Sequence, residues 1–295
     1  MRSRSWVVQA PCTLAGVLEA MGSAGAVQQG RVFVDGRRVL ADTGELVAGS
    51  IVEVFEARPP LEPARALDRR EGLVVAFKPA AMPTEPDRRG SGDSLVRVIA
   101  RDLALDARRV HAVSRLDVGV SGLVLLAITE GAQRHAAELQ QAGKLERHYL
   151  AIAAGCPTPP SGEWRGEVRV GSRALPAISR YRVIESLPSP RLQLLDAGGG
   201  TPSLLHLTPL TGRTHQLRQH ARAAGAALLG DRRYGGPSRL RDEGGGVLPL
   251  ARICLHAFRV VLADQRGAAW TVEAGSELLA SVWADLGGTP AMLPA

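Results

Sequence analysis

Residues 211–220 read TGRTHQLRQH, and this stretch limits how the chain can fold more than any other. A glycine turn is followed by helical spacing, so a helix is predicted from Thr214 to Ala224. The first turn of a helix exposes backbone N–H groups that favour an anion such as phosphate. Taken alone, a start rich in histidine and arginine is most often solvated or binds an anion.

Other segments on both sides of this stretch also carry polar residues suited to chemistry. Residues 114–122 read SRLDVGVSG and place one acidic residue in a loop between predicted strands at 110–113 and 122–128. Residues 147–151 read RHYLA and open a short strand, and residues 230–235 read GDRRYG. Each segment is weak alone, because an Arg-Leu-Asp tripeptide is usually a surface ion pair and a tyrosine that opens an apolar strand usually belongs to the core.

Together, in this order and spacing, the segments resemble the pattern of the RluA-type pseudouridine synthases. That pattern is H-R-L-D-x-x-T-S-G, then K-x-Y, then T-G-R-T-H-Q-[IL]-R-x-H and G-D-x-x-Y-G. The resemblance covers about residues 72–275. It implies the α+β fold of that family, with a mixed, mainly antiparallel sheet and a central cleft. Many short predicted strands and few helices also favour α+β architecture over alternating β-α-β units.

The resemblance also implies an active site. Asp117 would be the catalytic carboxylate of an enzyme that converts uridine in RNA to pseudouridine, and Arg218 would be the opposite charge that keeps it ionised. Tyr149 matches the family's active-site tyrosine, whose ring can stack on uracil and whose hydroxyl can assist proton movement. No metal and no cofactor is expected. The residues expected to bind the nucleotide are Arg115, Arg213 and His215.

Several positions depart from the family pattern. Ser114 replaces the usual His, Val120 the usual Thr and Arg147 the usual Lys, and residues 78–81, KPAA, lack the usual glycine. A second hypothesis therefore stays open: a catalytically silent RNA-binding or ribosome-assembly protein of the same fold. A third, a glycoside hydrolase, finds little support because no second acidic residue stands in a comparable motif.

The N-terminal region predicts a small α/β unit. Apolar residues have helical spacing from Leu14 to Met21, Asp35-Gly36 between apolar residues is a strong hairpin signal, and residues 51–55 predict a strand. This order resembles an S-four-like RNA-binding domain, in a degenerate form without the usual basic helix. The expected division is 1–57 for this domain, 58–71 for a proline-rich linker, 72–287 for the catalytic domain and 288–295 for a loose tail.

Composition favours a polyanionic partner. The net charge is +7 and the isoelectric point about 10.1, with lysine only at Lys78 and Lys144, so nearly all positive charge is arginine. RNA fits this balance, and we expect ribosomal RNA in preference to transfer RNA, although many proteins are mildly basic without binding nucleic acid.

No apolar run approaches the ~20 residues that span a bilayer. Three distant cysteines predict no disulfide framework. We expect a cytoplasmic monomer.

Overall fold

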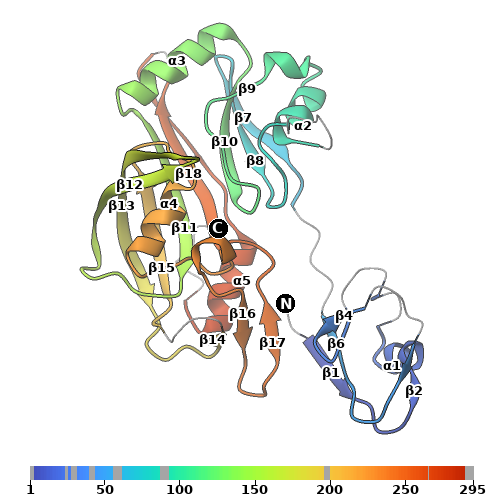
Figure 1. The fold of residues 1–295 in the computed structure, drawn as a ribbon. Coiled ribbons are helices and arrows are strands. Elements are labelled where there is room, and N and C mark those ends of the chain that lie inside the picture. Colours follow the sequence, from blue (N-terminus) through green and yellow to red (C-terminus); the bar gives the residue numbers. More distant parts are fainter. Residues whose placement is uncertain are drawn as a thin grey trace. The chain divides into compact units, whose positions relative to one another are not determined.

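A computed structural model describes residues 3–23, 26–27, 32–39, 44–55, 62–86, 93–195, 200–264 and 266–289 (Figure 1). The chain forms two compact units. The smaller holds Met1–Pro60 and Arg239–Leu250, and the larger holds Leu61–Ser238 and Ala251–Ala295. All residues expected at the active site belong to the larger unit. The domain limits expected from the sequence stay predictions.

A ten-stranded sheet is the framework of the larger unit. Its order is β12-β13-β15-β11-β18-β10-β8-β7, with β19 paired to β18 and β9 to β10. Among its described pairs only β10 with β18 is parallel. The expected α+β fold with a mixed, mainly antiparallel sheet is therefore confirmed. The strands are β7 (Arg65–Arg70), β8 (Leu73–Lys78), β9 (His111–Ala112), β10 (Ser121–Ala127), β11 (Leu145–Ala153), β12 (Ser161–Val170), β13 (Arg173–Ser186), β15 (Ser203–Pro209), β18 (Leu255–Ala263) and β19 (Ala269–Glu273), and β14 (Gln193–Leu195) lies outside this sheet.

Helices cover both faces of the sheet, whose central strands are mainly apolar. Every residue of β8 and β10 is buried, as expected for strands packed on both sides. Helices α2 and α4 share a core with Val124 and Leu126, whereas α3 packs with Leu123 and Leu125 on the other face. No described helix has the length and apolar character to cross a membrane. The helices are α2 (Leu95–Asp102), α3 (Glu130–Gln141), α4 (Gln216–Ala223) and α5 (Glu277–Leu286), with 3-10 turns at Ala107–Arg109 and Arg232–Tyr234.

Capping residues set the helix starts. The side-chain oxygen of Thr129 accepts the N–H of Ala132 and begins α3, as the sequence predicts. Helix α2 begins at the N-cap Ser94, whose hydroxyl accepts the N–H of Arg97, while the neighbouring Asp93 does not cap it. Helix α5 was not expected from the sequence and begins at the N-cap Ser276.

Two stretches are more regular than their composition indicates. Residues 65–70 lie in the expected linker but form β7, an edge strand whose polar, charged side chains stay largely exposed while its backbone pairs with β8. Residues 161–186 form one long hairpin, β12–β13, in place of several short strands. The expected loose tail lies outside the described residues from position 290 onward.

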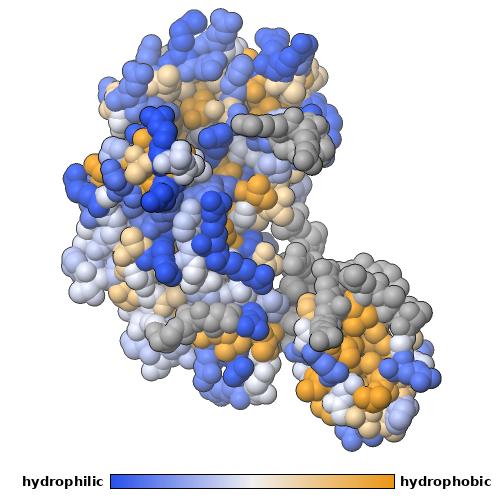
Figure 2. Space-filling view, viewed as in Figure 1, coloured by the Kyte–Doolittle hydropathy of each residue, from blue (hydrophilic) through white to orange (hydrophobic). Residues whose placement is uncertain are grey.

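The smaller unit contains a four-stranded sheet in the order β1-β6-β3-β4. The hairpin predicted at Asp35-Gly36 is present, with the positive φ values of 48° and 76° that a type I′ turn requires. Trp6, Val7 and Ile51 are exposed large hydrophobic residues. Figure 2 shows orange, hydrophobic residues on the surface of this unit. The S-four-like assignment stays a prediction. The elements are β1 (Ser3–Val7), β2 (Cys12–Thr13), α1 (Leu14–Ala20), β3 (Val32–Val34), β4 (Arg37–Arg38), β5 (Glu45–Leu46), β6 (Ile51–Phe55), β16 (Arg239–Arg241) and β17 (Val247–Pro249).

Candidate active site

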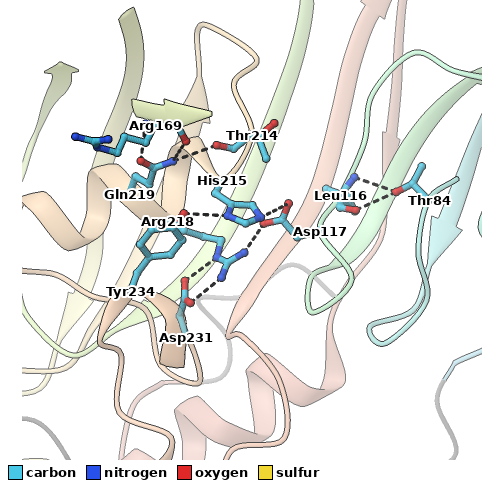
Figure 3. Close-up of polar contacts among 10 residues, drawn as sticks. All are labelled: Thr84, Leu116, Asp117, Arg169, Thr214, His215, Arg218, Gln219, Asp231 and Tyr234. Carbon is cyan, nitrogen blue, oxygen red and sulfur yellow. Dashed lines mark hydrogen bonds and ion pairs between the residues drawn. The ribbon is translucent and has the colours of Figure 1, made fainter. Parts of the chain in front are cut away.

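A cavity of about 750 Å³ opens in the larger unit between the loop that follows β9 and the start of α4. Asp117 and Arg218, 101 positions apart in the sequence, meet in it (Figure 3). The fold thus brings together the separated motifs that the sequence analysis singled out. The cavity is lined by every residue expected at the site: Asp117, Tyr149, Arg218, Arg115, Arg213 and His215.

Arg218 joins two carboxylates. Its Nη1 donates to Oδ2 of Asp117 at 2.8 Å, while Nε and Nη2 donate to the two oxygens of Asp231 at 2.7 and 2.8 Å (Figure 3). A planar guanidinium suits this forked geometry, which fixes both distance and direction. The centroid of the Tyr234 ring lies 5.0 Å from Cζ of Arg218, so the ring packs against the guanidinium group. Asp231 and Tyr234 therefore fix the position of the cation that Asp117 faces.

The electrostatics of this cluster explain why Arg218 can be buried. Its side chain is 7% exposed and that of Asp231 is 1% exposed. Burial alone would lower the pKa of Arg218, but the hydrogen bonds to Asp231 and Asp117 outweigh it, so the pKa is raised. A buried charge is tolerated when it is paired and hydrogen-bonded. Arg218 therefore remains a cation.

Side-chain hydrogen bonds fix the first half of the loop that presents Asp117. The Thr84 hydroxyl accepts the N–H of Leu116 at 3.1 Å and donates to its carbonyl at 3.0 Å. The Ser114 hydroxyl, at a departure from the family pattern, is buried and accepts the N–H of Leu125 at 3.1 Å. These bonds hold the backbone that leads into Asp117, whose side chain stays 26% exposed and open to the cavity.

His215 stands beside the same carboxylate. It is the N-cap of α4 and has a left-handed φ of 56°, a conformation uncommon outside glycine. Its Nε2 lies 3.6 Å from Oδ1 of Asp117, and its Nδ1 forms a 2.9 Å hydrogen bond with the Tyr234 hydroxyl. Burial lowers the pKa of His215, assisted by Arg218 and opposed by Asp117, which favours the neutral imidazole at neutral pH.

Tyr149 lies on β11 with its side chain buried against the cavity. Burial raises the pKa of Tyr149, with Arg147 lowering it and Asp117 raising it further, so the hydroxyl is protonated at neutral pH. No hydrogen-bond partner of this hydroxyl is found among the described residues. Tyr149 can therefore donate to a substrate without first breaking a contact within the protein.

The other two expected binding residues lie at the rim. Arg115 is 67% exposed and forms an ion pair with Glu85 at 3.3 Å. Arg213 is exposed, and its Nε donates to the carbonyl of Pro176 at 3.4 Å. Both can reorient toward a ligand at small cost, because exposed ion pairs and long hydrogen bonds are weak.

Some residues of the site were quoted in the sequence but given no role. Asp231 and Tyr234 both lie in the stretch GDRRYG, and that motif could have indicated them. Gln216 lies in the quoted stretch TGRTHQLRQH, and its amide oxygen accepts the N–H of Arg213 and the Thr211 hydroxyl, which shapes the turn before α4. Across the described parts of the chain, no group of three or more His, Cys, Asp or Glu side chains is arranged to hold a metal ion.

Comparison with known proteins shows the family of the chain. Residues 72–223 match the model of the RNA pseudouridylate synthase family. The chain is 39% identical over 181 residues to the chloroplastic RNA pseudouridine synthase 2 of Arabidopsis thaliana, covering 51% of this chain and 40% of that protein. It is 31% identical over 212 residues to the dual-specificity RNA pseudouridine synthase RluA of Escherichia coli, covering 68% and 87%. The solved human RNA pseudouridylate synthase domain containing 4 has the same fold, with a TM-score of 0.56 and 19% identity over 78% of this chain and 94% of that one. The chain belongs to the RNA pseudouridylate synthase family, in its RluA-type branch.

Proposed function

We propose that this protein isomerises uridine to pseudouridine in structured RNA and that Asp117 is its catalytic carboxylate. Family membership supports the type of reaction. The observation that carries the choice of residue is the 2.8 Å ion pair between Asp117 and Arg218 in the cavity.

The reaction sets clear demands on the site. The C1′–N1 bond of uridine breaks and a C1′–C5 bond forms, while C5 loses its proton and N1 gains one. No electrons pass to or from an outside reagent, so acid, base and nucleophile groups of the chain suffice. A carboxylate can act as a nucleophile at the sugar or ring, or as a base on C5.

Asp117 has the surroundings that such a role needs. Arg218 occupies Oδ2, which leaves Oδ1 turned toward His215 and the open cavity. A carboxylate held by a fixed cation pays little for reorganisation when the reaction begins. In this proposal Arg218 orients Asp117, and Tyr149 stacks on uracil and supplies its unpartnered hydroxyl for a proton transfer.

The target nucleotide must leave its helix to reach this cavity, because a base inside a duplex cannot be attacked. The volume of about 750 Å³ is within the range of pockets that enclose small ligands. Arg115 and Arg213 at the rim would hold the phosphates or the gap that the base leaves, and His215 would hydrogen-bond to the nucleotide.

We favour ribosomal RNA over transfer RNA as the substrate. Two relatives, from Vibrio vulnificus and Nitrosomonas europaea, are named ribosomal large subunit pseudouridine synthases. The E. coli relative is named dual-specificity, so transfer RNA is the competing target. We also propose that the protein acts in the cytoplasm as a monomer.

The alternative is a catalytically silent RNA-binding protein. It was suggested by the departures from the family pattern at Ser114 and Val120. Both residues are buried, and the Ser114 hydroxyl is hydrogen-bonded. The departures leave the contact between Asp117 and Arg218 intact, which weighs in favour of the enzyme.

The test compares wild-type protein with Asp117→Asn on RNA transcribed with tritium at C5 of uridine, since the reaction releases that proton to water. Modified positions are then mapped chemically in RNA from a deletion strain complemented with each variant. Asp102→Asn, an exposed substitution at the end of α2, is the matched control. We expect release with wild type and Asp102→Asn but none with Asp117→Asn. Equal release by all three would refute the role of Asp117, and modification by none would favour the silent protein.

A further inference from the structure

A second hollow, of about 930 Å³, lies against β11, β13 and β15. Tyr181 and Leu207 belong to the core cluster that includes α4, so by strand alternation their neighbours Arg182 and His206 point to the opposite face of the sheet. Arg182 and His206 stand opposite one another in the pairing of β13 with β15. We call this hollow, lined by Arg180, Arg182, His148 and His206, the rear groove.

The rear groove and the active-site cavity share a wall. One of its members, Arg147, has a buried Nε with no hydrogen-bond partner in the described part of the chain. A buried donor without a partner is unfavourable, and an anion that passed between the hollows would satisfy it. The residues that line both hollows are Gln140, Arg147, Pro209, Thr211, Gly212 and Arg213.

Positive charge exceeds negative charge around the rear groove. Its lining includes four arginines at 147, 180, 182 and 213 and two carboxylates, Glu146 and Glu163. Glu163 pairs with Arg180 at 3.3 Å and Glu146 lies 3.2 Å from the His148 ring, so arginines still outnumber carboxylates in the lining. Arg182 is exposed and forms no hydrogen bond or ion pair with any described residue. An anionic occupant therefore matches the groove.

Two imidazoles form part of the same lining. His148 Nδ1 and His206 Nε2 lie 3.1 Å apart, and their rings are tilted by 32° at a centroid distance of 5.2 Å. Burial lowers the pKa of both, that of His206 to about 4, so they are neutral at neutral pH. Neutral imidazoles beside arginines are suited to RNA, because histidine rings stack on unpaired bases while guanidinium groups bind phosphate.

We propose that the RNA strand flanking the target uridine leaves the active-site cavity over Arg147 and Arg213 and continues in the rear groove, where Arg180 and Arg182 bind its phosphates. This inference rests on the proposed function and extends it, since it assigns the path of the flanking strand. It gives Arg180 and Arg182 a role in binding and none in the chemical step.

The test uses Arg180→Gln, Arg182→Gln and the double variant, with Arg173→Gln as control. Arg173 is an exposed arginine at the turn of the same hairpin and lines neither hollow. Binding and single-turnover rates are measured on a full-length substrate RNA, and on RNAs shortened from the 5′ or the 3′ side of the target uridine. On full-length RNA we expect each groove variant to weaken binding roughly fivefold and to reduce the salt dependence by about one phosphate contact, with an unchanged maximal rate. Arg173→Gln should bind as wild type does.

The shortened RNAs decide the path of the strand. Removal of the flank that lies in the rear groove should weaken wild-type binding and abolish the difference in affinity between wild type and the groove variants. Removal of the other flank should leave that difference in affinity unchanged. The proposal fails if the groove variants match Arg173→Gln on full-length RNA, or if their defect persists on both shortened RNAs. Failure of the proposed function looks different, because wild type would then bind RNA in a groove-dependent way but modify none.

Discussion

The active-site cavity and the rear groove hold their arginines in opposite ways. In the cavity, Arg218 is 7% exposed and donates three hydrogen bonds to two carboxylates, so its position is set before a substrate arrives. In the groove, Arg182 is exposed and makes no such bond with the described residues. The difference separates two tasks. Chemistry benefits from a preorganised charge, whereas holding a flexible polyanion needs cations that can adjust to it.

The largest effect should come from removing the fixed cation. Arg218→Met leaves Asp231 buried without its partner, which should lower the free energy of unfolding by roughly 3–5 kcal/mol. Turnover should be lost because Asp117 is no longer oriented. Thermal denaturation and tritium release measure the two effects. Arg222→Met, at an exposed position of the same helix, is the control and should change neither. Turnover by Arg218→Met within tenfold of wild type would contradict the comparison.

A smaller effect is expected from the hydroxyl of Tyr149. Because this hydroxyl has no partner among the described residues, Tyr149→Phe should leave thermal stability nearly unchanged, yet lower the maximal rate by roughly 10²-fold if the hydroxyl moves a proton. Tyr181→Phe should do the reverse, since its hydroxyl donates to the Pro159 carbonyl at 2.9 Å. That variant should lose about 1 kcal/mol of stability and keep its maximal rate. If Tyr149→Phe keeps its full rate, the ring acts by stacking alone.

The loop behind Asp117 offers a more moderate test of preorganisation. Thr84→Val conserves shape but leaves the N–H and carbonyl of Leu116 without their shared partner. We expect a loss of about 1–3 kcal/mol in unfolding free energy and a several-fold lower maximal rate, with RNA affinity unchanged. A change in affinity with a normal rate would show that the loop serves binding instead.

The smallest effect concerns pH in the rear groove. Since burial lowers the pKa of His206 to about 4, the imidazole stays neutral from pH 8 to pH 6, and RNA affinity should change less than about twofold over that range. A further decrease in pH protonates His206, which should tighten RNA binding but destabilise the fold, because a lowered folded-state pKa gives stability that is lost below pH 6.5. His206→Gln should remove the tightening. A steep change in affinity between pH 8 and pH 6 that His206→Gln abolishes would show that the groove depends on histidine charge.

Motif order alone was enough to select the candidate catalytic residues that the fold brings together. Asp117, Tyr149 and Arg218 stand in segments whose spacing resembles the family pattern, and the fold brings all three to one cavity. The sequence could not show that Asp231 accepts two hydrogen bonds from Arg218, because a motif does not reveal which way a carboxylate points. The Asp117 role itself stays a proposal.

The rear groove lay beyond sequence reasoning for a different reason. Arg182 and His206 belong to two different strands, and their meeting depends on the register of β13 with β15. Alternation shows which residues share a face, but only the packing of α4 against Tyr181 shows which face is core. The sequence also does not predict helix α5, which begins at the N-cap Ser276.

One experiment tests the division between fixed and adaptable charge most directly: single-turnover tritium release from full-length RNA over a range of protein concentrations, for Asp117→Asn and Arg182→Gln side by side. We predict that Asp117→Asn binds RNA with unchanged affinity and releases no tritium at any concentration. Arg182→Gln should reach the wild-type rate at a roughly fivefold higher concentration. A measurable plateau rate for Asp117→Asn, or a lowered plateau for Arg182→Gln, would contradict the account.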